Sequence, residues 1–121
     1  PYLEKFNKRT IVCFDMSIPE LVRYTKALPP AQVATRLSEW EEAPLSEKCE
    51  WIWFDHFLAD RSLECFSKNR SRLGQKKIAL VSPELHGRDP RAFHHAVSEF
   101  ETRWEQPIYL CSDLLPWAVQ T

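Results

Sequence analysis

Five short apolar segments of strand length recur along this chain of 121 residues, each rich in β-branched or aromatic residues. Most are apolar at successive positions, which is typical of strands buried on both faces, as the strands of parallel sheets are. The chain has two glycines, and it lacks the Asn-Gly and Asp-Gly pairs that make tight antiparallel hairpins. We therefore expect a parallel sheet with strands at residues 10–14, 32–37, 51–54, 77–81 and 108–111.

Helix signals occupy the gaps between these segments. Residues 17–20, Ser-Ile-Pro-Glu, form a capping box with proline in the first turn, which predicts a helix over residues 18–27. Asp60 is the expected cap of a second helix that runs through Leu73, with Gly74 just after its end. Asp89 and Pro90 begin a third helix, whose apolar stripe falls on Phe93, Ala96, Val97, Phe100 and Trp104. The acidic stretch 38–48 is expected to hold a short helix or a loop.

The alternation of strand and helix predicts an α/β fold with right-handed crossovers, built as a single domain over residues 1–121. A doubly wound open sheet suits a chain of this length, whereas a TIM-type barrel needs eight strands and roughly 250 residues. Length by itself therefore favours the doubly wound sheet.

Composition excludes several classes of function. Sixteen Lys and Arg residues against seventeen Asp and Glu residues leave a formal net charge of −1, so no overall field attracts nucleic acid or anionic lipid. The apolar runs are far shorter than the roughly 20 residues of a membrane span. With two glycines, no G-x-G-x-x-G or Walker-type phosphate loop is present. The four cysteines form no C-x-x-C pair, and we expect buried free thiols in a reducing, cytoplasmic setting.

The chain turns polar within one or two residues of the end of each apolar segment. In parallel α/β sheets these carboxyl ends converge on the face that binds ligands, so a polar cluster is expected there. Three residues at these junctions, Ser17, Ser38 and Asp89, are interpreted as caps. The candidate substrate-binding residues are Asp15, Arg36, Asp55, Glu84, His86, Arg88 and Asp113.

A structural role stays open for these candidates. Arg36 needs a carboxylate or a bound anion beside it, and Asp15 or Asp55 is the expected partner. The segment 82–88 suits a phosphate or a sugar hydroxyl, but it also suits a rigid loop in which Arg88 pairs with Glu84. His94 and His95 fall on neighbouring faces of the third helix, so we exclude them as shared metal ligands. No motif for a nucleophile or a metal is present, and the residues predict a pocket without a reaction.

Several strand-plus-loop segments resemble the later strands of the glycerophosphodiester phosphodiesterase and phosphoinositide phospholipase C-like superfamily. The most specific is V-S-P-E-L-H-G-R at residues 81–88. Residues 111–116, C-S-D-L-L-P, approach the family's closing C-T-D-x-P, with Ser for Thr and one extra residue before the proline. Further similarity lies in I-V-C-F-D-M-S-I-P-E-L, V-A-T-R-L-S-E-W-E and W-I-W-F-D-H-F, at residues 11–21, 33–41 and 51–57.

The resemblance implies a TIM-type barrel, of which the five predicted strands would be strands four to eight. It therefore reverses the preference that length alone suggests. In the family, the two histidines that act as acid and base, and the acidic ligands of a divalent metal, come from early strands that open with an H-R-G or H-R-x motif. This chain contains neither motif, and His56 and His86 do not stand at matching positions. The implied Mg²⁺ or Ca²⁺ belongs to the complete barrel, and we expect none bound by this chain alone.

Two functions follow as expectations. The chain resembles the C-terminal part of a phosphodiester hydrolase, in which the candidate residues shape the substrate side of the pocket and the chain alone is inactive. The alternative is a non-catalytic half-barrel that binds an anionic or polyol ligand or a partner chain. In both cases the sheet has two open edges and an inner face carrying Phe14 and Trp53. A missing N-terminal half, a second copy of the chain or rearranged helices must cover them.

Overall fold

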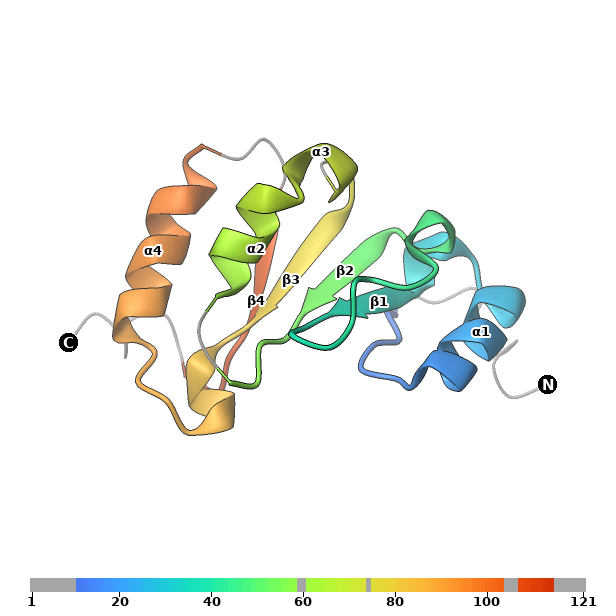
Figure 1. The fold of residues 1–121 in the computed structure, drawn as a ribbon, viewed down its shortest axis with the longest axis horizontal. Helices are drawn as coiled ribbons and strands as arrows, with labels where there is room; N and C mark the ends of the chain where they lie inside the picture. The colour runs from blue at the N-terminus through green and yellow to red at the C-terminus, as the bar shows by residue number, and fades with distance from the viewer. Residues whose placement is uncertain (1–10, 59–60, 74, 104–106, 115–121) are drawn as a thin grey trace.

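The computed structural model describes residues 11–58, 61–73, 75–103 and 107–114 (Figure 1). They form an α/β fold around one parallel sheet, as predicted. Its four strands are β1 (Ala34–Leu37), β2 (Trp51–Phe54), β3 (Lys77–Val81) and β4 (Ile108–Cys111), and they pair in the order β1-β2-β3-β4. Since spatial order follows chain order, the described strands contain no switch point of the kind that a doubly wound sheet requires.

The prediction of a fifth strand, at residues 10–14, is wrong. Residue 10 lies outside the described residues, and the rest of segment 10–14 makes one isolated parallel bridge, between Cys13 and Val33. The Cys13 N–H donates to the Gln32 carbonyl and the Cys13 carbonyl accepts from the Ala34 N–H, both at 2.9 Å. Asp15 then takes a left-handed backbone conformation with φ of 57°, which ends the extended run. The segment nonetheless lies where a fifth strand was expected, beside β1.

The strand predicted at 32–37 is shorter at its start. Pro30–Gln32 form a 3-10 turn, η2, so β1 begins at Ala34. The stretch 38–48 is mostly loop, with a 3-10 turn, η3, at Ser46–Lys48.

The first helix, α1 (Ile18–Ala27), has the predicted bounds, and the capping box of Ser17 and Glu20 is formed. The prediction of one continuous helix that runs through Leu73 is wrong. It is divided into α2 (Ser62–Lys68) and α3 (Arg70–Leu73) at Asn69, whose side-chain amide donates to the Cys65 carbonyl at 2.8 Å. The expected cap Asp60 and C-terminal Gly74 lie outside the described residues.

The third predicted helix is α4 (Arg91–Glu101), which begins after Pro90. Asp89 still serves its first turn, because its carboxylate accepts the Arg91 N–H at 3.0 Å. Trp104, the last position of the predicted stripe, lies outside the described residues. A further 3-10 turn, η4 (Pro83–His86), follows β3 and ends at Gly87, whose φ of 75° suits glycine.

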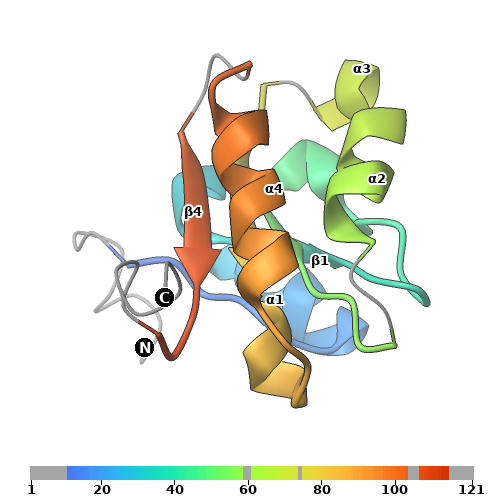
Figure 2. The ribbon, with the colours of Figure 1, turned by 90° about the vertical axis from the view of Figure 1, so that its left-hand side faces the viewer.

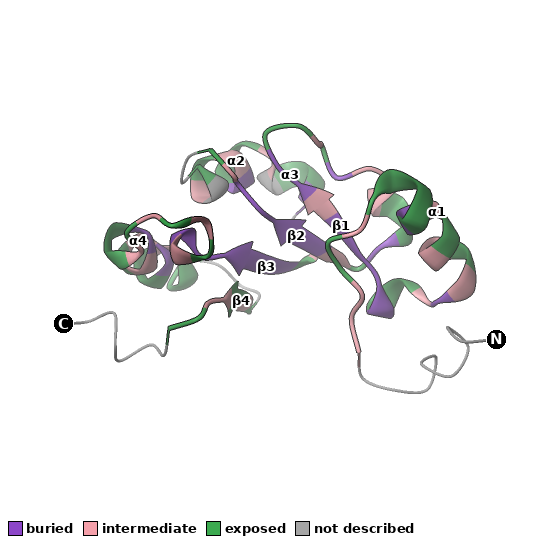
Figure 3. Ribbon diagram, turned by 90° about the horizontal axis from the view of Figure 1, so that it is seen from below, coloured by how far each residue is buried: buried purple, intermediate pink, exposed green. Residues whose placement is uncertain are grey.

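The described helices lie on one side of the sheet, which curves away from them (Figures 1 and 3). Alternate strand residues on this side form the main core with α2, α3 and α4, and α1 packs on a smaller cluster that includes Val33. The opposite face carries Trp51, Trp53, Tyr109 and smaller apolar residues, and no described helix covers it. The main core comprises Leu37, Ala43, Ile52, Phe54, Phe66, Leu73, Ile78, Leu80, Phe93 and Val97.

None of the helices in the described ranges has the length and apolar character needed to cross a bilayer.

Removing the ring of Phe66 should destabilise the fold most clearly. The side chain is fully buried, and its ring meets Phe54 and Phe100 edge to face. We expect Phe66→Ala to lower the free energy of unfolding by about 3–5 kcal/mol in urea titrations, because it leaves a cavity in the core. Leu58→Ala is the control, since Leu58 is 68% exposed and its truncation should change stability by less than about 0.5 kcal/mol. Equal losses in the two variants would contradict the assignment of the core.

Candidate functional site

The carboxyl ends of all four strands lie at one end of the molecule, together with η4 and the turn at Asp15 (Figures 1 and 2). We call this end the rim: residues 14–18, Arg36, and the segments 38–42, 55–58, 82–88 and 112–114. All seven candidate residues from the sequence belong to it.

Arg36 connects two loops of the rim. Its Nη1 donates to Asp15 Oδ1 at 2.7 Å, its Nη2 to Glu41 Oε1 at 3.1 Å, and its Nε to the other Glu41 oxygen. The hydrogen bonding that Arg36 donates to Glu41 is the largest of the influences that raise the pKa of Arg36 above its ordinary value, although partial burial opposes the increase. The predicted pairing with Asp15 is confirmed, and sequence reasoning missed Glu41. Two carboxylates therefore already neutralise this guanidinium.

Asp55 and His86 form a carboxylate–imidazole pair in which the carboxylate is buried and the imidazole is partly exposed. Asp55 directly follows β2, its side chain is 8% exposed, and its Oδ1 accepts from His86 Nε2 at 2.5 Å. The imidazole is 21% exposed and also contacts the ring of Phe57, at 4.9 Å between centroids. Because a carboxylate only accepts hydrogen bonds, His86 Nε2 carries the proton that is donated to Asp55.

Arg88 fastens the loop after β3 to the loop after β2. Its Nη1 donates to the Phe57 carbonyl and its Nη2 to the His56 carbonyl, both at 2.8 Å. The sequence offered Glu84 as a structural partner for Arg88, but the Glu84 carboxylate is engaged by other groups. Arg88 thus holds in place the two loops that carry Asp55 and His86.

Glu84 joins the end of β3 to the end of β4. Its carboxylate accepts hydrogen bonds from the hydroxyls of Ser82 and Ser112, and from the Asp113 N–H at 3.1 Å. Burial opposes ionisation of Glu84, but these hydrogen bonds outweigh it and hold the pKa below the ordinary value of 4.5. Asp113 enters the rim through this backbone contact, while its side chain is exposed.

His94 reaches the same cluster from α4. Its Nε2 lies 2.5 Å from the Ser82 hydroxyl oxygen. Since the single proton of that hydroxyl is donated to Glu84, the oxygen accepts from His94 Nε2–H. Ser82 is fully buried, so this arrangement fixes a loop and does not present a nucleophile. The position of His94 in the first turn of the helix that leaves the rim is the sequence signal for this contact.

Glu39 and Phe57 are two rim residues that sequence reasoning missed. Glu39 accepts the N–H groups of Phe57 at 3.0 Å and Leu58 at 2.8 Å, and so ties the loop after β1 to the loop after β2. Burial works against ionisation of Glu39, but these backbone bonds leave its pKa below the ordinary value. The Phe57 ring also stacks on Trp40, at 5.5 Å, and lies 5.8 Å from the Arg36 guanidinium carbon. The sequence W-F-D-H-F at residues 53–57 shows that an aromatic residue, Phe57, follows the strand, but it does not show what Phe57 will contact.

His56 is buried, whereas the imidazole of His86 is partly exposed. Desolvation lowers the pKa of His56 below the ordinary value of 6.5, although the nearby carboxylates of Glu39 and Asp55 oppose that shift. We therefore expect His56 to be neutral at pH 7.

The carboxylates of the rim converge near Cys111 at the end of β4. Burial is the main cause that raises the pKa of the Cys111 thiol, and Asp113, Asp55 and Glu84 raise it further because they are negative. Contacts therefore run across the rim from Asp15 through Arg36 and Phe57 to His86 and Asp55. The Glu84 cluster lies next to them, because Glu84 and His86 share the η4 turn.

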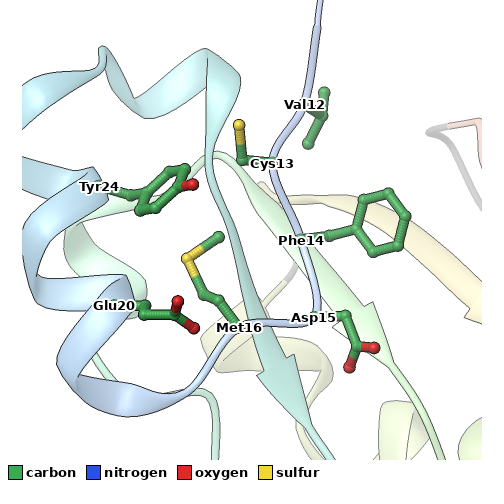
Figure 4. A pocket seen from close by; sticks show the side chains of 7 residues that line it. All are labelled: Val12, Cys13, Phe14, Asp15, Met16, Glu20 and Tyr24. Atoms are coloured by element: carbon green, nitrogen blue, oxygen red, sulfur yellow. The ribbon is translucent and has the colours of Figure 1, made fainter. Parts of the chain in front are cut away.

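A pocket of about 370 Å³ opens between α1 and the segment before it. Cys13, Met16 and Tyr24 turn toward one another there, whereas Phe14 points away from α1 (Figure 4). Phe14 instead stacks on Trp53, with ring centroids 4.1 Å apart. The pocket shares Phe14, Asp15 and Met16 with the rim, but neither Asp55 nor His86 lines it.

All four cysteines are free, as predicted, but only Cys49 is buried. Burial raises the pKa of Cys49 to about 11, so its thiolate is scarce at neutral pH. Among the described residues, no group of three or more His, Cys, Asp or Glu side chains is arranged to hold a metal ion.

Comparisons with protein-family models, curated proteins and solved structures give no match for the chain. The site is therefore interpreted from its own geometry. It contains one carboxylate–imidazole pair and several paired charges, held together by hydrogen bonds between loops from successive strands.

Replacing Glu84 should reveal its contribution to stability and the pH at which that contribution is lost. At pH 7 we expect Glu84→Gln to lower the free energy of unfolding by roughly 1–3 kcal/mol, because two serine hydroxyls and one N–H lose a charged acceptor. The folded-state pKa is depressed, so the stabilisation is present above pH 4.5 and disappears as the pH falls through the folded value. The difference in the free energy of unfolding between wild type and variant, measured by urea titration, should therefore disappear over that acidic range.

Glu101→Gln, on the exposed end of α4, is the matched control and should unfold as the wild type does. A gap for Glu84→Gln that does not change between pH 7 and pH 3 would contradict the assigned role of its carboxylate.

Proposed function

We propose that this chain is the substrate-side part of a phosphodiester-hydrolysing barrel that resembles the glycerophosphodiester phosphodiesterases. The observation that carries the proposal is the rim, in which polar side chains from five successive loops lie at the carboxyl ends of parallel strands. In barrels of the TIM type that end holds the active site.

The order of the strands supports a barrel-like arrangement. Each described crossover advances the sheet by one strand in the same direction, and the helices lie on one side of the sheet. A closed barrel is built from this repeated step, with its helices outside and side chains filling its interior. The inner face here would then be the aromatic one, with Trp51, Trp53 and Tyr109.

The inner face also supports an incomplete barrel. Tyr109 is 47% exposed and Phe14 is 49% exposed, and both lie on the outermost segments of the sheet. Trp53 Nε1 is buried without a hydrogen-bond partner in the described structure. A second group of parallel strands would cover these rings, pair both edges of the sheet and give the indole N–H an acceptor.

In this proposal Asp15, Arg36, Asp55, Glu84, His86, Arg88 and Asp113 shape the substrate side of the pocket. Their contacts divide them into two groups. The imidazole of His86 and the carboxylate of Asp15 retain exposed surface, whereas Glu84 and Arg88 hold loops in position. The described residues do not form a site for the divalent metal that the resemblance implies, so its ligands and the catalytic acid and base would belong to other strands.

The pairing of charges in the rim favours a second candidate function. Arg36 is neutralised by two carboxylates and Arg88 donates to two carbonyls, so neither guanidinium is held ready for a phosphate alone. A non-catalytic half-barrel that binds a polyol or anionic ligand, or a second copy of the chain, would tolerate such pairing.

Hydrolysis of glycerophosphocholine with added Mg²⁺ or Ca²⁺ tests the leading function. We expect no turnover by this chain alone and turnover by the longest product of its gene, because the acid, base and metal ligands lie on other strands. Within the longer product, His86→Ala should raise KM by about tenfold, the loss of one hydrogen bond to the substrate. Turnover by the short chain, or by neither protein, would contradict the proposal.

Sedimentation of the purified short chain separates the two functions. A self-standing half-barrel must cover its sheet edges with a second copy, so it should form a dimer of defined stoichiometry that dissociates on dilution. A partial barrel exposes the same edges when it is purified without the other strands, so for it we expect self-association without a defined stoichiometry. Tyr109→Glu, which places a charge on the open face, should dissociate the dimer if that face is the interface.

A further inference from the structure

The pocket of about 370 Å³ between α1 and the segment before it has no part in the function proposed above. This volume is near the lower end of the roughly 300–1,000 Å³ of ligand pockets, so it suits a small molecule. Four side chains of the lining turn toward one another there: Cys13 and Met16 from the segment, and Glu20 and Tyr24 from α1 (Figure 4). None of the four is among the candidate substrate-binding residues of the rim.

The fold holds the walls of this pocket in place. The Cys13 backbone is hydrogen bonded to Gln32 and Ala34, both at 2.9 Å, which fixes the segment beside β1. The capping box of Ser17 and Glu20 fixes the first turn of α1. The walls pack on the smaller core cluster, which comprises Leu21, Leu28, Val33 and Cys49. Because the site is already shaped, binding there costs little ordering of the protein.

The α1 wall supplies a carboxylate and a hydroxyl with unused hydrogen-bonding capacity. Glu20 Oε2 accepts from the Ser17 N–H at 3.3 Å and from the Ser17 hydroxyl at 3.2 Å, while Oε1 has no partner among the described residues. The Tyr24 hydroxyl also makes no hydrogen bond within the described ranges. Glu20 and Tyr24 are four residues apart on one helix, so their side chains lie on the same face.

Charge determines which kind of ligand this wall accepts. None of the described residues that line the pocket is Lys or Arg, and the other carboxylate, Asp15, is already bound by Arg36 at 2.7 Å. An anion would be repelled by Glu20, and a neutral apolar molecule would cover the carboxylate without supplying a donor. The described residues also form no metal-binding group of three. The wall therefore favours an organic cation.

The opposite wall indicates the body of that cation. Cys13 and Met16 contribute sulfur atoms there, and the Tyr24 ring borders the same space (Figure 4). Thioether sulfur makes favourable contacts with aromatic rings, and two aromatic rings pack well edge to face or offset. An aromatic body gains from both kinds of contact.

We propose that this pocket binds a small aromatic amine. Its ammonium group donates to Glu20 Oε1 and to the Tyr24 hydroxyl, as a charge-assisted contact, and its ring packs against Met16 and Cys13. The inference does not depend on hydrolysis at the rim.

Protection of Cys13 from a thiol reagent tests the site. Cys13, Cys65 and Cys111 are all partly exposed, and burial raises the pKa of each thiol, but only Cys13 lines this pocket. We expect phenethylamine to slow the reaction of Cys13 with methyl methanethiosulfonate several-fold and to leave the other two rates unchanged. Mass spectrometry of the peptides measures all three rates in one sample.

Two molecules with the same body separate charge from shape and need no variant. 2-Phenylethanol is neutral and phenylacetate is an anion at neutral pH, so neither should protect Cys13 at the concentration at which phenethylamine does. Equal protection by the alcohol would refute a cation site. Equal protection of Cys65 and Cys111 by phenethylamine would refute binding at this pocket.

Variants of the α1 wall test the two polar contacts. Glu20→Gln removes the charge but keeps a side chain that completes a capping box, so α1 should be retained. We expect the dissociation constant of phenethylamine, from NMR titration of the Met16 amide signal, to rise about fivefold, as for an ion pair near the surface. Tyr24→Phe should raise it about threefold. Glu47→Gln, on the exposed η3 turn, is the matched control and should leave it unchanged.

Three results would overturn the proposal: no protection of Cys13 by phenethylamine, unchanged affinity in Glu20→Gln, or equal losses in Glu20→Gln and Glu47→Gln. Circular dichroism of each variant shows that any loss is not unfolding. Hydrolysis of glycerophosphocholine is measured separately, so its failure would leave the amine site in place.

Discussion

Parallel pairing in chain order is the constraint on which the rest of this molecule depends. Because β1 to β4 run the same way and each lies beside the next, every strand ends at the same end of the sheet. The return segments, with their helices, then lie on one side, where they bury Ile52, Phe54, Ile78 and Leu80. The polar loops gather at one end, and the opposite face of the sheet receives no described helix.

The gathering of loops brings many charges into a small volume, and hydrogen bonding determines how they are accommodated. A buried carboxylate or guanidinium is costly unless it is paired, and here each such group has partners from a neighbouring loop. Asp55 accepts from His86, Arg36 donates to Asp15 and Glu41, and Glu84 joins two strand ends. These contacts join the loops of the rim to one another. Most of its charged residues therefore hold loops in position, in addition to any part they take in binding a ligand.

The positions of strands and helices were largely accessible from local patterns. The capping box at Ser17 and the apolar run Trp51–Phe54 produce the elements expected of them, because capping and strand burial depend on neighbouring residues. The errors lie where local signals compete. Asn69 divides a helix that the apolar pattern describes as continuous, and Asp15 ends the segment that was expected to be a fifth strand. The seven candidates also meet at one rim, as the ends of parallel strands must.

The partners of those candidates depended on long-range packing. Sequence alone determined the α/β class, the parallel sheet and the end of the sheet where polar residues collect, since periodicity and capping act over a few residues. Only the tertiary structure decided that Glu41 neutralises Arg36, that His86 faces Asp55 and that His94 reaches Ser82. Contacts such as Asp55–His86 join residues more than 30 positions apart, and no local preference encodes which side chain will meet which.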